Sequence, residues 1–169
     1  QGIKKVIIAV PEMSIGKSFK STPLSDFGFV ADWEVADRYN LCLSLAQSDT
    51  RKTAIFSEFI TSDVSDNSLP QVLVCTHHSF RYGFDKVIED GGSIELFNDV
   101  LIGIDEFHHV SADDSNRLGA ILDSIMTQTS AHIVAMTGSY FRGDSVPILS
   151  DSDEEKFDNY VVINPKIIS

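Results

Sequence analysis

Apolar residues fall in short runs along this chain of 169 residues, and polar turns separate the runs. Three runs, at 4–10, 71–75 and 100–104, are rich in β-branched residues, which is typical of strands buried on both faces of a sheet. Residues 118–126 instead place apolar side chains at i, i+3, i+4, i+7 and i+8, which predicts an amphipathic helix. A further apolar run at 132–136 predicts a strand after that helix.

Three other segments complete the predicted alternation of strands and helices. Apolar residues at positions 35, 39, 42, 43 and 46 have helical spacing and predict a helix over 35–46, whereas 52–56 and 160–163 are interpreted as strands. Strands that alternate with helices imply crossover connections and a mostly parallel sheet. We therefore expect an α/β fold, a parallel sheet of about five to seven strands with helices on both faces.

Polar groups suited to chemistry directly follow three of the predicted strands. A turn follows Val10, Asp105 follows the run at 100–104, and Thr137 follows the run at 132–136. Because ligands of parallel sheets bind beyond the carboxyl ends of the strands, these three positions are expected to meet at one edge of the sheet.

The charge of the chain limits which surfaces it can offer to a partner. Lys and Arg number 13 and Asp and Glu number 25, so the formal net charge is −12. A nucleic-acid partner would therefore have to bind a local groove or another part of the protein, since nucleic-acid binders usually carry a basic surface. No apolar run approaches the roughly 20 residues of a membrane span, and two cysteines favour a cytoplasmic location.

The sequence Gly16-Lys17-Ser18 after the first strand matches the core of a phosphate-binding loop. Such a loop needs backbone N–H groups directed at phosphate, a Lys that reaches the β- and γ-phosphates, and a hydroxyl that binds Mg²⁺. Pro11 and Ser14 stand where glycines are usual in this pattern. The alternative interpretation is a chance occurrence of these three residues in a turn.

The pair Asp105-Glu106 ends an apolar strand, where an Asp can hold Mg²⁺ and a Glu can polarise the attacking water. The alternative is a pair of carboxylates that stabilises the start of a helix. Four of the five histidines form two adjacent pairs, at 77–78 and 108–109. Because neighbouring residues of a helix or strand point in different directions, such pairs are poor chelators of a single metal ion.

Three segments together resemble the first motor domain of superfamily-two helicases and translocases, the DEAD/DEAH-box-like group, and within it the type III restriction ATPases. Residues 105–110 (DEFHHV) resemble the DEAH box, 136–144 (MTGSYFRGD) resemble the L-T-A-T-P-F-R-G-D segment, and 72–80 (VLVCTHHSF) are similar to the I-V-x-T-x-Q-S-L segment. The order and spacing agree from residue 4 to about 145. The resemblance implies a P-loop NTPase fold of the RecA-like type.

The resemblance also implies roles in binding ATP with Mg²⁺. Backbone amides of Ser14, Ile15 and Gly16 would surround phosphate, and Lys17 would bind the β- and γ-phosphates. Ser18 would help to hold Mg²⁺.

On the acidic strand end, the resemblance implies that Asp105 shares the Mg²⁺ with the phosphate loop. Glu106 would be the general base that activates water. Together with Lys17, these two carboxylates would form the catalytic group.

Further roles implied by the resemblance concern coupling and nucleic acid. His108, Thr137 and Ser139 would couple the nucleotide state to a second domain. Thr76 and Ser79 would contact the backbone phosphates of DNA or RNA. Capping of a helix is the alternative role for Thr76 and Ser79, because a cap and a phosphate contact use the same geometry.

We expect residues 1–169 to form a single RecA-like ATP-binding domain, a fragment of a longer helicase that also has a second RecA-like motor domain. The expected function is ATP binding and hydrolysis in a nucleic-acid helicase or translocase. The alternative is a catalytically weak module on the same fold that senses nucleotide or binds another protein.

Overall fold

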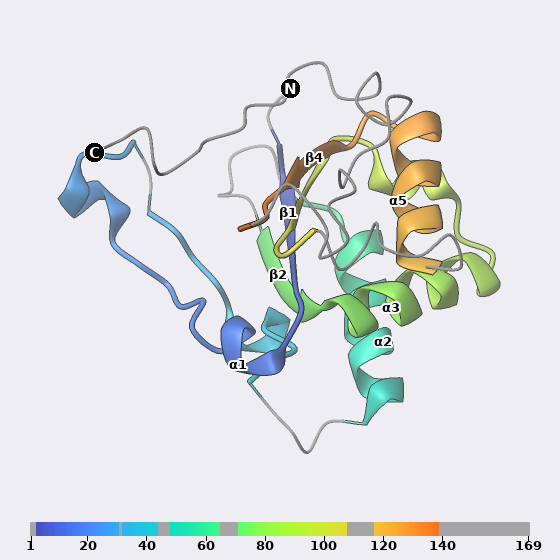
Figure 1. Ribbon diagram of the computed structural model, residues 1–169, viewed down its shortest axis with the longest axis horizontal. Helices are drawn as coiled ribbons and strands as arrows, with labels where there is room; N and C mark the ends of the chain where they lie inside the picture. Colours follow the sequence, from blue (N-terminus) through green and yellow to red (C-terminus); the bar gives the residue numbers. More distant parts are fainter. Residues whose placement is uncertain (1–2, 31, 44–47, 65–70, 108–116, 139–169) are drawn as a thin grey trace.

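The computed structural model describes residues 3–30, 32–43, 48–64, 71–107 and 117–138, and it contains a four-stranded parallel sheet. The strands are β1 (Lys5–Val10), β2 (Gln71–Thr76), β3 (Val100–Ile104) and β4 (His132–Ala135), in the order β2-β1-β3-β4 (Figure 1). All four were predicted from the apolar runs, so the parallel α/β character of the fold is confirmed. The predicted strand at 160–163 lies outside the described residues.

The central position of β1 explains its nearly continuous apolar sequence. Ala9 pairs with Cys75 of β2 on one side and with Ile104 of β3 on the other. A strand with neighbours on both edges and packing on both faces has no side chain directed at solvent. Beyond β2, Asn40 forms one further parallel bridge to Val74, so the sheet is extended there by a single residue.

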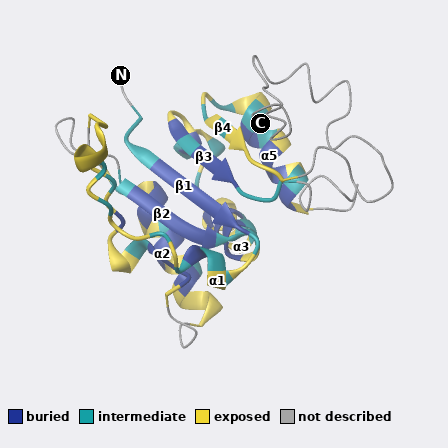
Figure 2. Ribbon diagram, turned by 60° about the vertical axis from the view of Figure 1, so that its left-hand side comes forward, coloured by how far each residue is buried: buried dark blue, intermediate teal, exposed yellow. Residues whose placement is uncertain are grey.

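Three long helices pack on one face of the sheet: α2 (Asp49–Thr61), α3 (His77–Glu89) and α5 (Arg117–Gln128) (Figure 1). Their apolar sides and one face of the strands form the larger core, in which Phe56, Phe80 and Phe97 are fully buried (Figure 2). Phe97 comes from η3 (Ile94–Phe97), the short turn between α3 and β3. The helix predicted over 118–126 is confirmed as part of α5.

The opposite face of the sheet is covered by shorter elements. These are the single turn α1 (Met13–Gly16) and irregular residues within 19–30 and 32–43, of which Phe19, Trp33, Val35 and Cys42 pack on the strands. The same ranges include the short turns η1 (Leu24–Phe27) and η2 (Asp37–Tyr39). Helices were expected on both faces, but among the described residues the long ones all lie on one.

The sequence interpretation is wrong in two places within the described residues. The helix predicted over 35–46 is absent from residues 35–43, because Asn40 and Leu41 pair with β2 instead. The strand predicted at 52–56 is part of α2, whose N-terminus is capped by the hydroxyl of Ser48. Ile55, Phe56, Phe59 and Ile60 form its buried side, a helical spacing hidden by the β-branched and aromatic composition.

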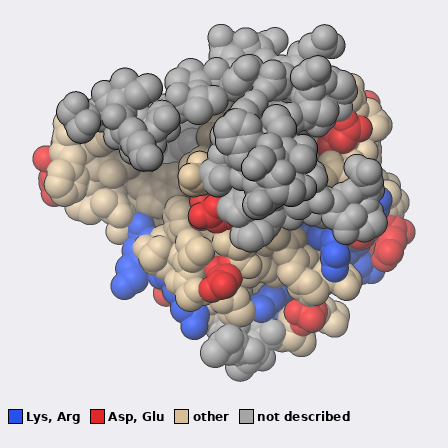
Figure 3. All heavy atoms as spheres, in the orientation of Figure 1, with Lys and Arg blue, Asp and Glu red and all other residues tan. Residues whose placement is uncertain are grey.

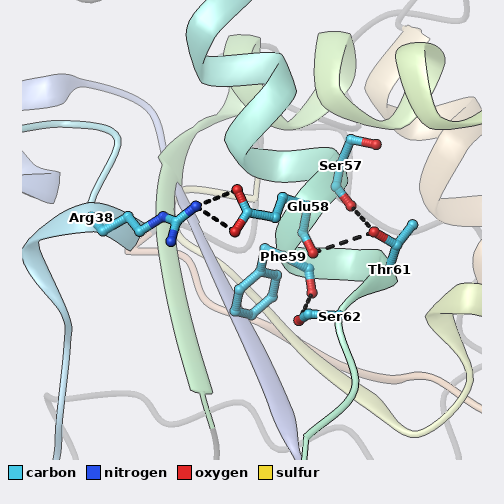
Figure 4. Close-up of polar contacts among 6 residues, drawn as sticks. All are labelled: Arg38, Ser57, Glu58, Phe59, Thr61 and Ser62. Atoms are coloured by element: carbon cyan, nitrogen blue, oxygen red, sulfur yellow. Dashed lines mark hydrogen bonds and ion pairs between the residues drawn. The ribbon is translucent and has the colours of Figure 1, made fainter.

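Side-chain contacts fix the end of α2 and join it to η2 (Figure 4). Arg38 in η2 forms an ion pair with Glu58, and the same carboxylate accepts hydrogen bonds from the guanidinium. At the C-terminal end of α2, the hydroxyls of Thr61 and Ser62 donate to the carbonyls of Ser57 and Phe59 at 2.8 and 2.9 Å. The ion pair thereby attaches η2, which belongs to the irregular residues, to the C-terminal half of α2.

Candidate nucleotide and nucleic-acid site

The carboxyl ends of the strands bring the predicted groups to one edge of the sheet. The N–H of Asp105 donates to the carbonyl of Ala9 at 2.9 Å, and the N–H of Met136 donates to Ile104 at 2.8 Å. The turn after Val10, the acidic pair and the segment before Thr137 are therefore neighbours, as expected from the strand pattern. Thr76, at the end of β2, pairs with Val10 and lies at the same edge.

The acidic pair sits in a tight turn after β3. Glu106 has a φ of 50°, a left-handed conformation that favours glycine. Its N–H donates to Oδ1 of Asp105 at 3.0 Å, and the N–H of Phe107 donates to the carbonyl of Met136 at 2.9 Å. Asp105 and Glu106 are both half-buried at this edge.

The Gly16-Lys17-Ser18 segment forms a helical turn in this structure. The N–H groups of Gly16, Lys17 and Ser18 donate to the carbonyls of Glu12, Met13 and Ile15 at 3.2, 3.0 and 3.0 Å. Lys17 caps the C-terminus of α1, whereas the predicted phosphate loop would start a helix near its Lys.

Phosphate could therefore use the amide of Gly16 only if this turn opened. The amides of Ser14 and Ile15 lie in the first turn, where a helix leaves its N–H groups without intrahelical acceptors. The hydroxyl of Ser18 donates to the carbonyl of Ile15 at 2.7 Å and still has lone pairs for a metal ion.

Asn40 holds the end of α1 in place and was not singled out from the sequence. The side chain is only 3% exposed, and Nδ2 donates to the carbonyls of Gly16 and Phe19 at 3.0 and 3.1 Å. Its Oδ1 accepts the N–H of Cys42 at 3.1 Å. The amide thus joins α1 to the sheet edge at Val74, and only the fold, not the local sequence, brings these partners together.

Gly16 has a packing role in addition to its place in the motif. A Cβ built on Gly16 would lie 2.3 Å from the Sγ of Cys42 and 3.3 Å from Val10. No other residue fits there without a shift of the chain. A glycine at position 16 is therefore required by the contact of α1 with Cys42.

The thiol of Cys42, which packs against Gly16, is affected by two lysines. Burial raises the pKa of the Cys42 thiol, and the positive charges of Lys52 and Lys17 oppose this rise. Lys52 is buried and lies in α2, whereas the sequence had placed it in a strand.

The predicted nucleic-acid residues cap a helix in this structure. The Oγ1 of Thr76 accepts the N–H of Ser79 and donates to its hydroxyl, both at 3.1 Å. Ser79 is 7% exposed. These contacts are those of a helix cap, the alternative role considered for Thr76 and Ser79. The capped helix, α3, was not predicted from the sequence.

The imidazole of His77 connects the start of α3 to the acidic turn. Its Nε2 lies 2.9 Å from the carbonyl oxygen of Asp105. In the sequence, His77 stands out only as one of two adjacent histidines. No local signal identifies this contact, because it depends on the order of the strands.

Of the three predicted coupling residues, Thr137 is described and is exposed after β4. His108 and Ser139 lie outside the described residues. On the face drawn in Figure 3, basic side chains occur in separate groups with acidic ones among them, in keeping with the acidic composition. None of the helices in the described ranges is long and apolar enough to cross a membrane.

The fold and the site define an α/β protein with a parallel sheet, compatible with a RecA-like fold, whose polar groups gather at the carboxyl edge. The chain is 52% identical over 158 residues to the Bacillus subtilis (strain 168) protein named "Putative ATP-dependent helicase YeeB". The match covers 94% of this chain and 24% of that protein, so the chain spans about a quarter of its relative's length. No family model matches the chain, and no solved structure matches it.

Proposed function

We propose that this chain is an ATP-binding and ATP-hydrolysing motor domain of a nucleic-acid helicase or translocase, and that it acts as part of a longer cytoplasmic protein. The observation that carries the proposal is the acidic turn of Asp105 and Glu106 at the carboxyl edge of the sheet, next to the end of β1. The helicase name of the relative agrees with this chemistry. That name favours the motor function over the non-catalytic alternative.

The side chains at this edge suit a magnesium ion bound with nucleotide. Mg²⁺ prefers hard oxygen ligands, and Asp105 and the hydroxyl of Ser18 would supply them. The ion would neutralise negative charge on the phosphates. Lys17 would bind the β- and γ-phosphates, and this role requires its ammonium to turn toward the carboxyl edge.

Glu106 is proposed as the general base. A carboxylate one residue after the metal ligand can orient a water molecule and accept its proton while Asp105 stays ionised. The left-handed backbone at Glu106 turns the chain sharply directly after Asp105. We propose that this turn directs the two carboxylates apart. Divergent directions allow one carboxylate to face the metal ion and the other to face water.

The partners proposed for the longer protein are DNA or RNA and a second RecA-like domain. The second domain would contribute the arginine that completes charge stabilisation, an effect worth on the order of 10³ to 10⁵ in rate. Thr76 and Ser79 are proposed to contact the backbone phosphates of the nucleic acid. Thr137, His108 and Ser139 are proposed to couple the nucleotide site to the second domain. On the face drawn in Figure 3, Lys and Arg side chains are interrupted by acidic ones. Nucleic acid would therefore contact this face through a few phosphates rather than along an extended basic surface.

The test is ATP hydrolysis and ATP binding by the full-length protein that carries this chain. Glu106→Gln is expected to lower hydrolysis by roughly 10²- to 10⁴-fold and to leave binding of ATP with Mg²⁺ nearly unchanged, because it removes the base but not the metal ligand. Lys17→Ala should weaken both.

Lys20→Ala, an exposed lysine three residues beyond Lys17, is the matched control and should behave as wild type. Hydrolysis that survives Glu106→Gln would show that another group is the base. Unchanged ATP binding by Lys17→Ala would exclude the Gly16-Lys17-Ser18 turn from the phosphate site, and the phosphates would then be held elsewhere in the longer protein.

A further inference from the structure

The hydrogen bond between His77 and Asp105 spans the sheet edge. His77 is the first residue of α3 and follows β2, whereas Asp105 follows β3, and β1 lies between these two strands. The Nε2 of His77 is 2.9 Å from the carbonyl oxygen of Asp105. A carbonyl oxygen only accepts hydrogen bonds, so Nε2 carries the proton and donates.

The carbonyl that receives this bond belongs to the peptide that joins Asp105 to Glu106. The orientation of this peptide sets the left-handed φ of 50° at Glu106. A non-glycine residue in this region costs about 1–2 kcal/mol and persists only where its surroundings hold it. The bond from His77 is one of the contacts that hold the turn, together with the N–H of Phe107 on Met136.

The other end of the bond is firmly fixed in the fold. The cap formed by Thr76 and Ser79 closes the first turn of α3, and Phe80 in that turn is fully buried in the core. A shift of the first turn of α3 would therefore move the His77 ring and, through it, the Asp105–Glu106 peptide.

We propose that His77 is a positioning residue for Glu106 and that it links the start of α3 to the acidic turn. The inference rests on the proposed function, in which Glu106 is the base and Thr76 and Ser79 contact nucleic acid. The direction of the Glu106 carboxylate would then respond to the position of α3, where nucleic acid would bind.

His78 provides a matched comparison, because it is the same residue type at the next position. Its ring is exposed and stacks on Tyr82 with ring centroids 4.5 Å apart. Consecutive residues of a helix point in different directions, so His78 is not expected to share the contact of His77 with Asp105.

The experiment measures kcat and KM for ATP in the full-length protein with single-stranded DNA and, separately, single-stranded RNA present. His77→Ala is expected to lower kcat by about ten- to a hundredfold through misplacement of the base, with the KM for ATP changed less than about twofold. His77→Gln should restore most of kcat, because its side-chain amide can donate to the same carbonyl. His78→Ala should match wild type.

Glu106→Gln is measured alongside and separates the two proposals. Loss of hydrolysis in Glu106→Gln with wild-type kcat in His77→Ala would overturn the role of His77 and leave the proposed function intact. Equal losses in His77→Ala and His77→Gln, or a higher KM at unchanged kcat, would also overturn it. Retained hydrolysis in Glu106→Gln would show that Glu106 is not the base, and would so overturn the role of His77 while the ATPase function stands.

Discussion

Glu106, the proposed general base, has a left-handed backbone conformation. Its φ of 50° places the Cβ near the following carbonyl, a conformation that costs about 1–2 kcal/mol for a residue other than glycine. Strained residues of this kind are common at catalytic positions, where surrounding contacts maintain them. A glycine would relieve the strain but would remove the carboxylate that the proposed reaction uses.

Glu106→Gly is therefore expected to be more stable than Glu106→Ala by about 1 kcal/mol, because only glycine adopts this conformation without strain. Neither variant should hydrolyse ATP. Urea denaturation of both variants gives the difference directly. The same pair of substitutions at Glu95, in the right-handed η3, should show the reverse order. An alanine variant at 106 as stable as the glycine variant would show that the turn relaxes.

The sequence was sufficient to predict Asp105 and Glu106 at the end of a strand, because a buried apolar run and the polar residues after it are local features. It could not predict the left-handed backbone of Glu106 or the bond from His77. Both depend on contacts with Met136 and with the start of α3, which are distant in the sequence.

At the scale of elements, α1 depends on Asn40 more than on its own sequence. One turn of helix is too short to be stable alone. Asn40 holds it through two carbonyls and is itself fixed by Cys42 and by the bridge to Val74.

Asn40→Ala is expected to lower the free energy of unfolding by about 2–3 kcal/mol, because the carbonyls of Gly16 and Phe19 and the N–H of Cys42 would all lose their hydrogen bond to the Asn40 side chain. Asn98→Ala is the matched control. The side chain of Asn98 also bonds to backbone, because its Oδ1 accepts the N–H of Ser130. Asn98 is exposed, so water can replace this bond, and Asn98→Ala should lower the free energy of unfolding by less than about 1 kcal/mol. An equal decrease in the free energy of unfolding at the two positions would show that the hydrogen bonds from Asn40 to the end of α1 contribute little to stability.

The elements themselves were predictable where hydrophobic periodicity and burial agree, as in β1 and α5. The prediction failed where composition and period conflict, as in α2, whose β-branched residues at 53 and 55 suggested a strand. It also failed over 35–43, where the helical spacing is real but Asn40 joins the sheet. In residues 35–43, the hydrogen bonds to β2 outweigh the local preference for a helix.

For the whole molecule, the net charge of −12 coexists with an exposed apolar tip around η1 (Figure 2). Phe27 and Phe29 are 73% and 62% exposed, and Val30 is fully exposed. Apolar side chains gathered at a protruding tip favour self-association. Their exposure also means that they contribute little to the free energy of folding.

Replacement of Phe27 and Phe29 by serine together is expected to change the free energy of unfolding by less than about 0.5 kcal/mol per site. Self-association, measured by sedimentation, should decrease. Phe97→Ser, at a buried position of the same residue type, should cost at least about 3 kcal/mol. A comparable loss from the tip substitutions would show that the tip packs against the rest of the protein.

The contact between Gly16 and Cys42 has a consequence for mutagenesis of this region. Any side chain at position 16 collides with the thiol at 2.3 Å, whatever happens at the nucleotide site. Loss of activity in a Gly16 variant would therefore be ambiguous evidence, since a damaged fold gives the same result as a damaged phosphate site. Lys17 follows α1 as its C-terminal cap and is only half-buried, so a substitution there is expected to disturb the fold less than one at Gly16 and to report more directly on nucleotide.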